Sequence, residues 1–128
     1  MNVATVSHGP VASVFLAHRG PLEEIRTVHV DPATRTSIEL LRILLAERGC
    51  RPDFRPLAGY ADAANLDTVL LIGNPALEFR RSGAPHTLWD LGGAWGQFTG
   101  LPFVYATWVV RDSPEAALLA DGLRAAFD

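Results

Sequence analysis

The sequence predicts an α/β domain with a mainly parallel sheet flanked by helices. Short β-prone apolar runs alternate along the chain with segments in which apolar residues recur at helical spacing. The run Val69–Ile72, "VLLI", is apolar on both faces, as expected for a strand at the centre of a parallel sheet. A chain of 128 residues is long enough to bury a real core as one domain. In sheets of this kind, ligands bind where the strands end and helices begin.

Five segments have the composition of strands. Each is short, rich in β-branched or aromatic residues, and bounded by glycine, proline or polar residues. The predicted strands are Val11–Ala17, Arg26–Val30, Phe54–Leu57, Val69–Ile72 and Phe103–Val110.

Four segments have helical signals. The clearest follows the stretch "DPATRTS", where Ile38, Leu41, Leu44 and Leu45 recur at helical spacing before Gly49 ends the pattern. The other three helices are expected to start at the N-cap residues Asn74, Asp90 and Ser113.

Composition excludes several classes of protein. The net charge is −3, and all eleven basic residues are arginines spread along the chain, which argues against a nucleic-acid partner. Cys50 is the only cysteine, and the four histidines have no metal-site spacing, so we expect neither a disulfide nor a bound metal. No segment resembles a secretion signal or a membrane span. We therefore expect a soluble, cytoplasmic protein without a membrane partner.

The start of the first helix is a candidate anion site. Backbone N–H groups in the first turn of a helix have no intrahelical partner, and the helix dipole adds positive charge there. Thr34, Thr36 and Ser37 add hydroxyl groups and Arg35 adds a fixed cation. The alternative is that one hydroxyl only caps the helix, which stabilises it by about 1 kcal/mol. The pair Gly73–Asn74 occupies a similar position after the strand Val69–Ile72.

Several segments together resemble the menaquinone biosynthesis family of the futalosine pathway. They are "GPVASVFL", "RTSIELLRILL", "VLLIGNPALEF" and "DLGGAWGQFTGLPFVYATWVVR", and they span nearly the whole chain. The run D-L-G-x-x-W-x-x-x-T-G-L-P-F-V-x-A-x-W, from Asp90 to Trp108, is similar to the chorismate dehydratase branch. The sister branch, 1,4-dihydroxy-6-naphthoate synthase, carries a histidine base where this chain has Gly73.

This resemblance implies a type II periplasmic-binding-protein-like fold, in which two α/β lobes are joined by hinge strands and clamp a ligand between them. The chain would be a single partial unit. Its first hinge strand is expected at about 11–18, the second lobe at about 25–100, and the return hinge strand with the C-terminal helix at about 103–127. The family's N-terminal lobe would be missing, so Met1 is expected to be an internal start or the end of a fragment.

The resemblance also implies a reaction and a set of binding residues. The reaction would be loss of water from chorismate to give 3-[(1-carboxyvinyl)oxy]benzoate, catalysed by a carbon-oxygen lyase that uses no cofactor or metal. Thr36 and Ser37 would bind a carboxylate of this small anionic substrate, with Arg35, Gly73 and Asn74 nearby. The family usually has aspartate where this chain has Asn74. No residue is identified as the catalytic proton acceptor, and the truncated chain is expected to be inactive or incomplete.

Two other functions remain open. The chain could be a non-catalytic carboxylate-binding or interaction module, with exposed hinge strands that pair with another chain or form a homo-oligomer. A lesser alternative is the naphthoate synthase activity of the sister branch.

Overall fold

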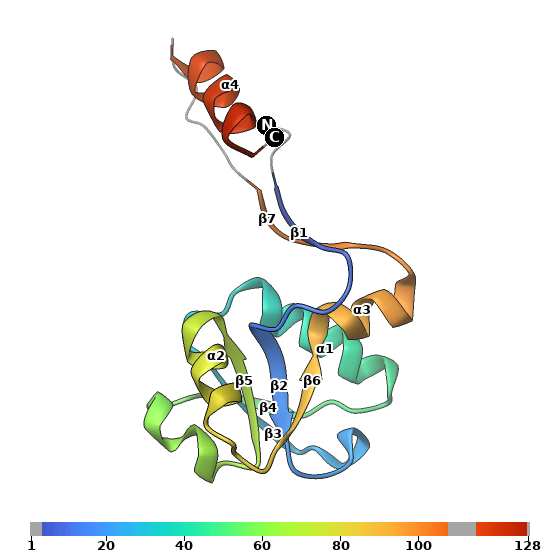
Figure 1. Cartoon of the computed structure of the whole chain (residues 1–128). Coiled ribbons are helices and arrows are strands. Elements are labelled where there is room, and N and C mark those ends of the chain that lie inside the picture. Colours follow the sequence, from blue (N-terminus) through green and yellow to red (C-terminus); the bar gives the residue numbers. More distant parts are fainter. Residues whose placement is uncertain (1–3, 108–114, 128) are drawn as a thin grey trace.

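A five-stranded sheet forms the body of the molecule (Figure 1). The computed structural model describes residues 4–107 and 115–127. The order of strands across this sheet is β4-β3-β5-β2-β6. Their bounds are Val14–His18 for β2, Thr27–Val30 for β3, Asp53–Pro56 for β4, Thr68–Ile72 for β5 and Thr87–Asp90 for β6.

The sheet is mostly parallel, as the sequence predicts. β3 pairs in parallel with both β4 and β5, whereas β2 pairs antiparallel with β5 and with β6. β2 therefore runs against the other strands. The sequence did not indicate this reversal, because an apolar run such as Val11–Ala17 has the same pattern in either direction.

Helices cover both faces of the sheet. α1 (Thr36–Glu47) and α3 (Leu91–Thr99) pack on one face, over a core that includes Leu16 and Leu70. α2 (Gly73–Arg81) and the 3-10 helix η2 (Tyr60–Asn65) pack on the other, over Phe15, Val69 and Leu71. Neighbouring residues of β2 and β5 thus point to opposite faces, which is why both strands are apolar throughout.

Most predicted elements are confirmed with small shifts in their ends. α1 ends before Gly49, whose φ of 78° is the left-handed conformation expected after a helix. α2 begins at Gly73, one residue before the predicted N-cap Asn74. The elements that the sequence did not predict are β1 (Ala4–Ser7), β6 and the 3-10 helices η1 (Leu22–Glu24) and η2. α4 spans Ala116–Phe127; the predicted helix start at Ser113 and the strand end at 108–110 lie outside the described residues.

The two strands that leave the body are not the pair expected from the family resemblance. β1 pairs antiparallel with β7 (Phe103–Thr107) to form a two-stranded ribbon, at whose far end α4 lies (Figure 1). Residues 14–18 of the expected first hinge strand instead form β2, which has a partner on each side within the sheet. Residues 103–107 of the expected return strand do lie in the ribbon. The pattern of an apolar run predicts burial and strand, but it does not identify the pairing partner.

The chain between the ribbon and β2 is held to the body by hydrogen bonds from three residues of two elements, β6 and α2. Both carboxylate oxygens of Asp90 lie 2.8 Å from the backbone nitrogen of Val11. Arg80 donates to the carbonyl of Ala12, with its Nη2 at 3.0 Å, and the Gly73 N–H donates to the carbonyl of Ser13 at 2.8 Å. Val11–Ser13, here called the anchor segment, is therefore fixed to α2 and to the end of β6.

The other strand of the ribbon is braced by α3. The indole N–H of Trp95 donates to the carbonyl of Pro102 at 3.2 Å, and its ring meets Phe103 edge-on at a centroid distance of 5.3 Å. Gly93 lies against Pro10, which a Cβ at position 93 would approach to 3.6 Å.

The ribbon and α4 leave large apolar side chains in solvent, which the sequence also suggested. The exposed fractions are 61% for Leu101, 49% for Val104, 75% for Leu118 and 54% for Leu119. Within the described residues, no helix has the length and apolar character that a membrane span requires.

Replacing Asp90 with alanine is predicted to destabilise the fold by more than the loss of a helix cap alone. Asp90 caps α3 by accepting from the Gly93 N–H at 2.9 Å, a bond worth about 0.5–2 kcal/mol. The part-buried Val11 N–H also loses its acceptor, which adds about 1–3 kcal/mol. Urea unfolding should show a larger loss of unfolding free energy in Asp90→Ala than in Asp90→Asn, because asparagine keeps one acceptor oxygen. Equal loss in the two variants would contradict this account.

Candidate functional site

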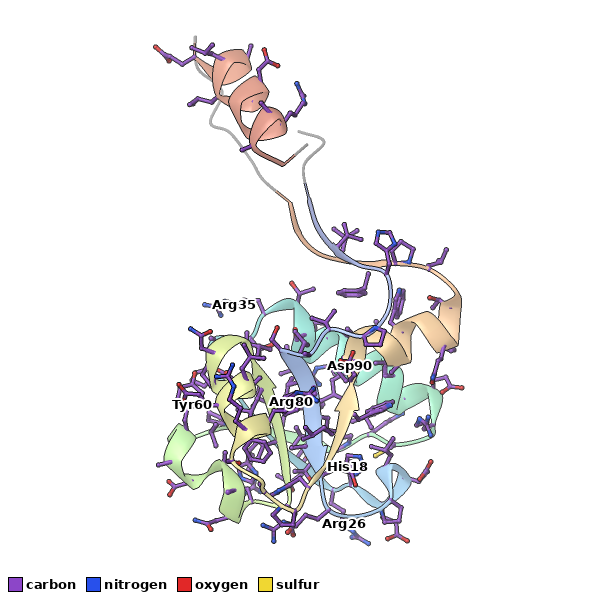
Figure 2. All side chains as sticks on the ribbon, viewed as in Figure 1. His18, Arg26, Arg35, Tyr60, Arg80 and Asp90 are labelled. Atoms are coloured by element: carbon purple, nitrogen blue, oxygen red, sulfur yellow. The ribbon has the colours of Figure 1, made fainter. Side chains whose placement is uncertain are left out.

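The candidate site lies at the edge of the sheet where the parallel strands end. β3, β5 and β6 run in the same direction and are followed at this edge by α1, α2 and α3. Figure 2 shows Arg35 and Asp90 at this edge, which we call the carboxyl edge, and His18 and Arg26 at the opposite one. The anchor segment and the ribbon also join the body here. Ligands of doubly wound α/β proteins bind at such edges.

A tight turn carries the chain from β3 into α1. The Asp31 N–H donates to the Leu70 carbonyl at 3.0 Å, which extends the pairing of β3 with β5 by one residue. The Asp31 side chain then accepts from the Ala33 N–H at 2.9 Å, and its carbonyl accepts from the Thr34 N–H at 3.0 Å. Asp followed by Pro32 is the sequence expected for such a turn. Because Asp31 is completely buried, the turn is part of the core rather than a loose loop.

α1 starts within the residues that the sequence predicted. Its N-cap is Arg35, which makes no side-chain cap hydrogen bond. Arg35 and Thr36 are exposed at the carboxyl edge, whereas Ser37 is buried. Of the two hydroxyl residues expected to bind a ligand, Thr36 is thus the one that presents its side chain to solvent.

The start of α2 lies at the same edge. β3 and β5 are parallel neighbours in which Val30 is paired with Leu70, so the two strands end at the same edge of the sheet. Gly73 and Asn74 are both exposed, and the N-cap Ile72 makes no side-chain cap hydrogen bond. Gly73 has a φ of 66°, a conformation that residues with a side chain rarely adopt. The structure therefore brings the predicted residues of both helix starts to one edge of the sheet.

Tyr60 is a residue of this edge that the sequence analysis missed. It lies in η2, directly after the loop that follows β4, and its hydroxyl donates to Oδ1 of Asp31 at 2.8 Å. Its ring also lines a cavity of about 220 Å³ together with Pro75 of α2. Tyr60 thus contacts the turn that leads into α1 and lines a cavity beside α2. No local pattern could reveal this contact, because the two residues are 29 positions apart and only the fold brings them together.

The turn also contains two buried oxygens without a hydrogen-bond partner among the described residues. They are Oδ2 of Asp31 and Oγ1 of Thr34. Thr34 is 8% exposed, so both side chains are more than nine-tenths buried. Buried polar atoms are usually paired, and unpaired ones concentrate at functional or strained positions. The carboxylate of Asp31 is therefore held through Oδ1 alone.

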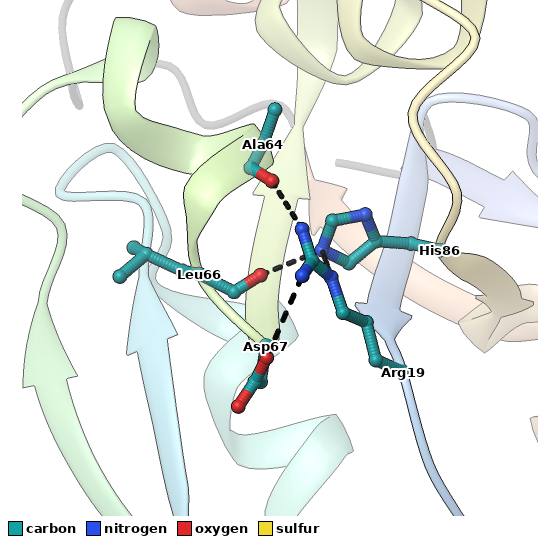
Figure 3. Close-up of polar contacts among 5 residues, drawn as sticks. All are labelled: Arg19, Ala64, Leu66, Asp67 and His86. Carbon is teal, nitrogen blue, oxygen red and sulfur yellow. Dashed lines mark hydrogen bonds and ion pairs between the residues drawn. The ribbon is translucent and has the colours of Figure 1, made fainter.

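Other polar clusters have a structural explanation. At the opposite edge, Arg19 reaches across to the Ala64 carbonyl and to Asp67, and His86 contacts the Leu66 carbonyl at 2.6 Å (Figure 3). These contacts connect the end of η2 and the residues after it with Arg19, which directly follows β2, and with His86, which directly precedes β6. A cavity of about 600 Å³ lies beside them, and one of about 420 Å³ lies beside the base of the ribbon. In the part of the chain that is described, no His, Cys, Asp and Glu side chains are grouped to hold a metal ion.

Titration of Tyr60 offers a direct check of its bond to Asp31. The hydrogen bond to Asp31 raises the pKa of Tyr60 above its ordinary value, with smaller contributions from burial and from the Asp31 charge. Because the folded pKa is raised, this contact stabilises the fold at neutral pH, and the stabilisation is lost as pH rises through the raised pKa. Ultraviolet titration of tyrosinate should show Tyr60 ionising at lower pH in Asp31→Ala than in the wild type, with Tyr60→Phe identifying its signal. An unchanged titration would contradict the contact.

The comparisons with known proteins agree with this geometry. A family model described as menaquinone biosynthesis matches residues 1–128. The chain is also similar to the chorismate dehydratase of Thermus thermophilus, with 34% identity over 135 residues that cover 92% of this chain and 50% of the relative. The chain thus spans about half the length of the curated relative that it matches. On these grounds the chain belongs to the menaquinone biosynthesis family.

Proposed function

We propose that this chain carries the carboxylate-binding half of a chorismate dehydratase of the futalosine pathway. The bound group is a carboxylate of chorismate, and the site is the α1 start with Arg35, Thr36 and Ser37, next to Gly73 and Asn74 of α2. The fold in which it acts is a type II periplasmic-binding-protein-like clamp, of which the five-stranded sheet is one lobe and the β1–β7 ribbon the connection. A cytoplasmic location fits this role.

The observation that carries the proposal is the position of the α1 start, with its exposed cation and hydroxyl, at the carboxyl edge. Arg35 makes no side-chain cap bond, and Arg35 and Thr36 are exposed at the point where ligands of such sheets bind. The positive end of the helix dipole and a fixed guanidinium both favour a carboxylate there. The 34% identity to a chorismate dehydratase, over 92% of this chain, supports chorismate as the source of that carboxylate.

The reaction makes modest demands on the protein. Chorismate loses its ring hydroxyl and one ring proton as water, and the ring becomes aromatic in 3-[(1-carboxyvinyl)oxy]benzoate. Aromatisation favours the elimination, so the protein needs mainly to hold the dianion in a reactive pose and to exclude competing water. Thr36 holds the substrate rather than removing its proton, because an unassisted hydroxyl is a poor base near neutral pH, and the buried Ser37 supports the helix start beside it.

Removing the Thr36 hydroxyl is predicted to weaken chorismate binding by about tenfold or more, since a hydrogen bond to a charged group contributes about 1.5–3 kcal/mol. Alanine has a higher helix propensity than threonine, so Thr36→Ala does not lower the intrinsic helix propensity of α1. Tryptophan fluorescence during a chorismate titration measures the change. The matched control is Thr87→Ala, which removes an exposed threonine hydroxyl from the opposite end of the sheet. Equal affinities in the two variants would exclude Thr36 from the site.

The second candidate is a non-catalytic carboxylate-binding or interaction module. It is favoured by one observation: apolar surface is exposed on or beside the ribbon and on α4, at Leu101, Val104, Leu118 and Leu119. In this function the exposed ribbon pairs with another chain, a second copy included. The naphthoate synthase activity is less favoured, because Gly73 has a φ of 66° where the sister branch carries its histidine.

A turnover assay separates the two candidates. The proposed dehydratase predicts that purified chain at high concentration converts chorismate slowly to the enol ether product, detected by chromatography, or gains this activity when the other half of the Thermus thermophilus relative is added. Binding of chorismate without product under both conditions would favour the non-catalytic module. A reaction without protein serves as the background control.

A further inference from the structure

We propose that Asp31 and Tyr60 are positioning residues that hold the start of α1 in place for the substrate carboxylate. This inference rests on the proposed function, because it gives the two side chains a role at that site. Neither side chain was among the binding residues expected from the sequence, and the completely buried Asp31 cannot itself touch a ligand in this conformation.

The Asp31 carboxylate connects the turn before α1 with η2 through a single oxygen. Oδ1 accepts the Ala33 N–H at 2.9 Å from within the turn and the Tyr60 hydroxyl at 2.8 Å from η2. Oδ2 is buried and has no partner among the described residues. A buried carboxylate requires hydrogen-bond donors, because leaving a charge unpaired away from water is costly. The two donors to Oδ1 are therefore what keeps this carboxylate in the core.

Loss of the Tyr60 hydroxyl has a definite structural consequence. The buried carboxylate would keep one neutral donor, and the turn would have to open so that water can reach Asp31. Opening the turn breaks the bond between the Thr34 N–H and the Asp31 carbonyl and moves Arg35, the N-cap of α1. The orientation of the helix start then varies. A carboxylate held by several donors at fixed angles loses affinity when those donors are no longer arranged in advance.

Tyr60 is suited to this role because its hydroxyl reaches the turn before α1 from a separate element, η2. Tyr60 also lines a cavity that Pro75, in the first turn of α2, lines as well. It therefore ties the turn before α1 to η2, which lies on the same face of the sheet as α2.

The experiment compares three variants with a matched control in the full chain. Tyr60→Phe removes only the hydroxyl, Asp31→Ala removes the acceptor, and Asp31→Asn keeps the acceptor oxygen while removing the charge. The control is Ser82→Ala, which removes a hydroxyl that donates to the Phe79 carbonyl at 2.6 Å at the far end of α2. Two properties are measured in each: the dissociation constant for chorismate and the exchange rates of individual backbone amides.

Backbone amide exchange tests the inference in protein without bound ligand. Tyr60→Phe should speed exchange of the Ala33 and Thr34 amides by about three- to tenfold, the effect of one lost hydrogen bond. The Gly93 amide, which is held by the carboxylate of Asp90, should keep its wild-type rate. Ser82→Ala should change none of these three amides. Wild-type exchange at Ala33 and Thr34 in Tyr60→Phe would overturn the inference whatever the protein binds.

Chorismate affinity then links the turn to the site. Tyr60→Phe and Asp31→Ala should each raise the dissociation constant several-fold, Ser82→Ala should leave it unchanged, and Asp31→Asn should recover most of the affinity lost in Asp31→Ala. Faster exchange with wild-type affinity would show that the pair only stabilises the fold and would overturn the inference. Failure of the wild-type chain to bind chorismate at all would refute the proposed function, and the exchange rates would still test the turn.

Discussion

The parallel pairing of β3 with its two neighbours is the constraint from which the candidate site follows. Once β3 and β5 run side by side in register, Asp31 and Gly73 must emerge at the same edge, and the helices that follow them must begin there. β2 can run in the opposite direction without disturbing this, because its reversal only brings the anchor segment to that edge as well. The directions of these strands therefore bring the two helix starts, Tyr60 and the base of the ribbon to one edge of the sheet.

The core is what allows this edge to carry exposed polar groups. α1 and α3 bury one face of the sheet and α2 buries the other, so the edge itself need not contribute apolar packing. Asp31 is the exception, since it is a polar residue placed inside the core. Its three hydrogen bonds to backbone groups and the one from Tyr60 compensate for that burial only in part, because Oδ2 remains unpaired. Stability has been given up at this position, which is common where a site must be held in a defined shape.

The sequence predicted the elements and the two helix starts well but the pairing of strands poorly. Apolar periodicity and cap residues identify α1, β5 and α3 because these signals are local. The reversal of β2, the partner of β7 and the bond from Tyr60 to Asp31 are all contacts between distant parts of the chain. β6 was missed because its four residues run directly into α3 and carry no turn of their own. Thr36 could be identified as a candidate from composition, whereas the burial of Ser37 beside it depends on how α1 rotates onto the sheet.

The anchor segment has a mechanical consequence for the ribbon. Val11–Ser13 is fastened by Asp90, Arg80 and Gly73, and Pro102 and Phe103 are fastened by Trp95, so neither strand can flex where it meets the body. On the first strand, rotation is left to the residues between β1 and the anchor segment, where Gly9 has a φ of 146°. On the second strand, Phe103 is itself the first residue of β7, so the contact with Trp95 reaches into the ribbon. A change in the direction of the ribbon therefore has to turn about Gly9 on one side and move the Trp95 contacts on the other.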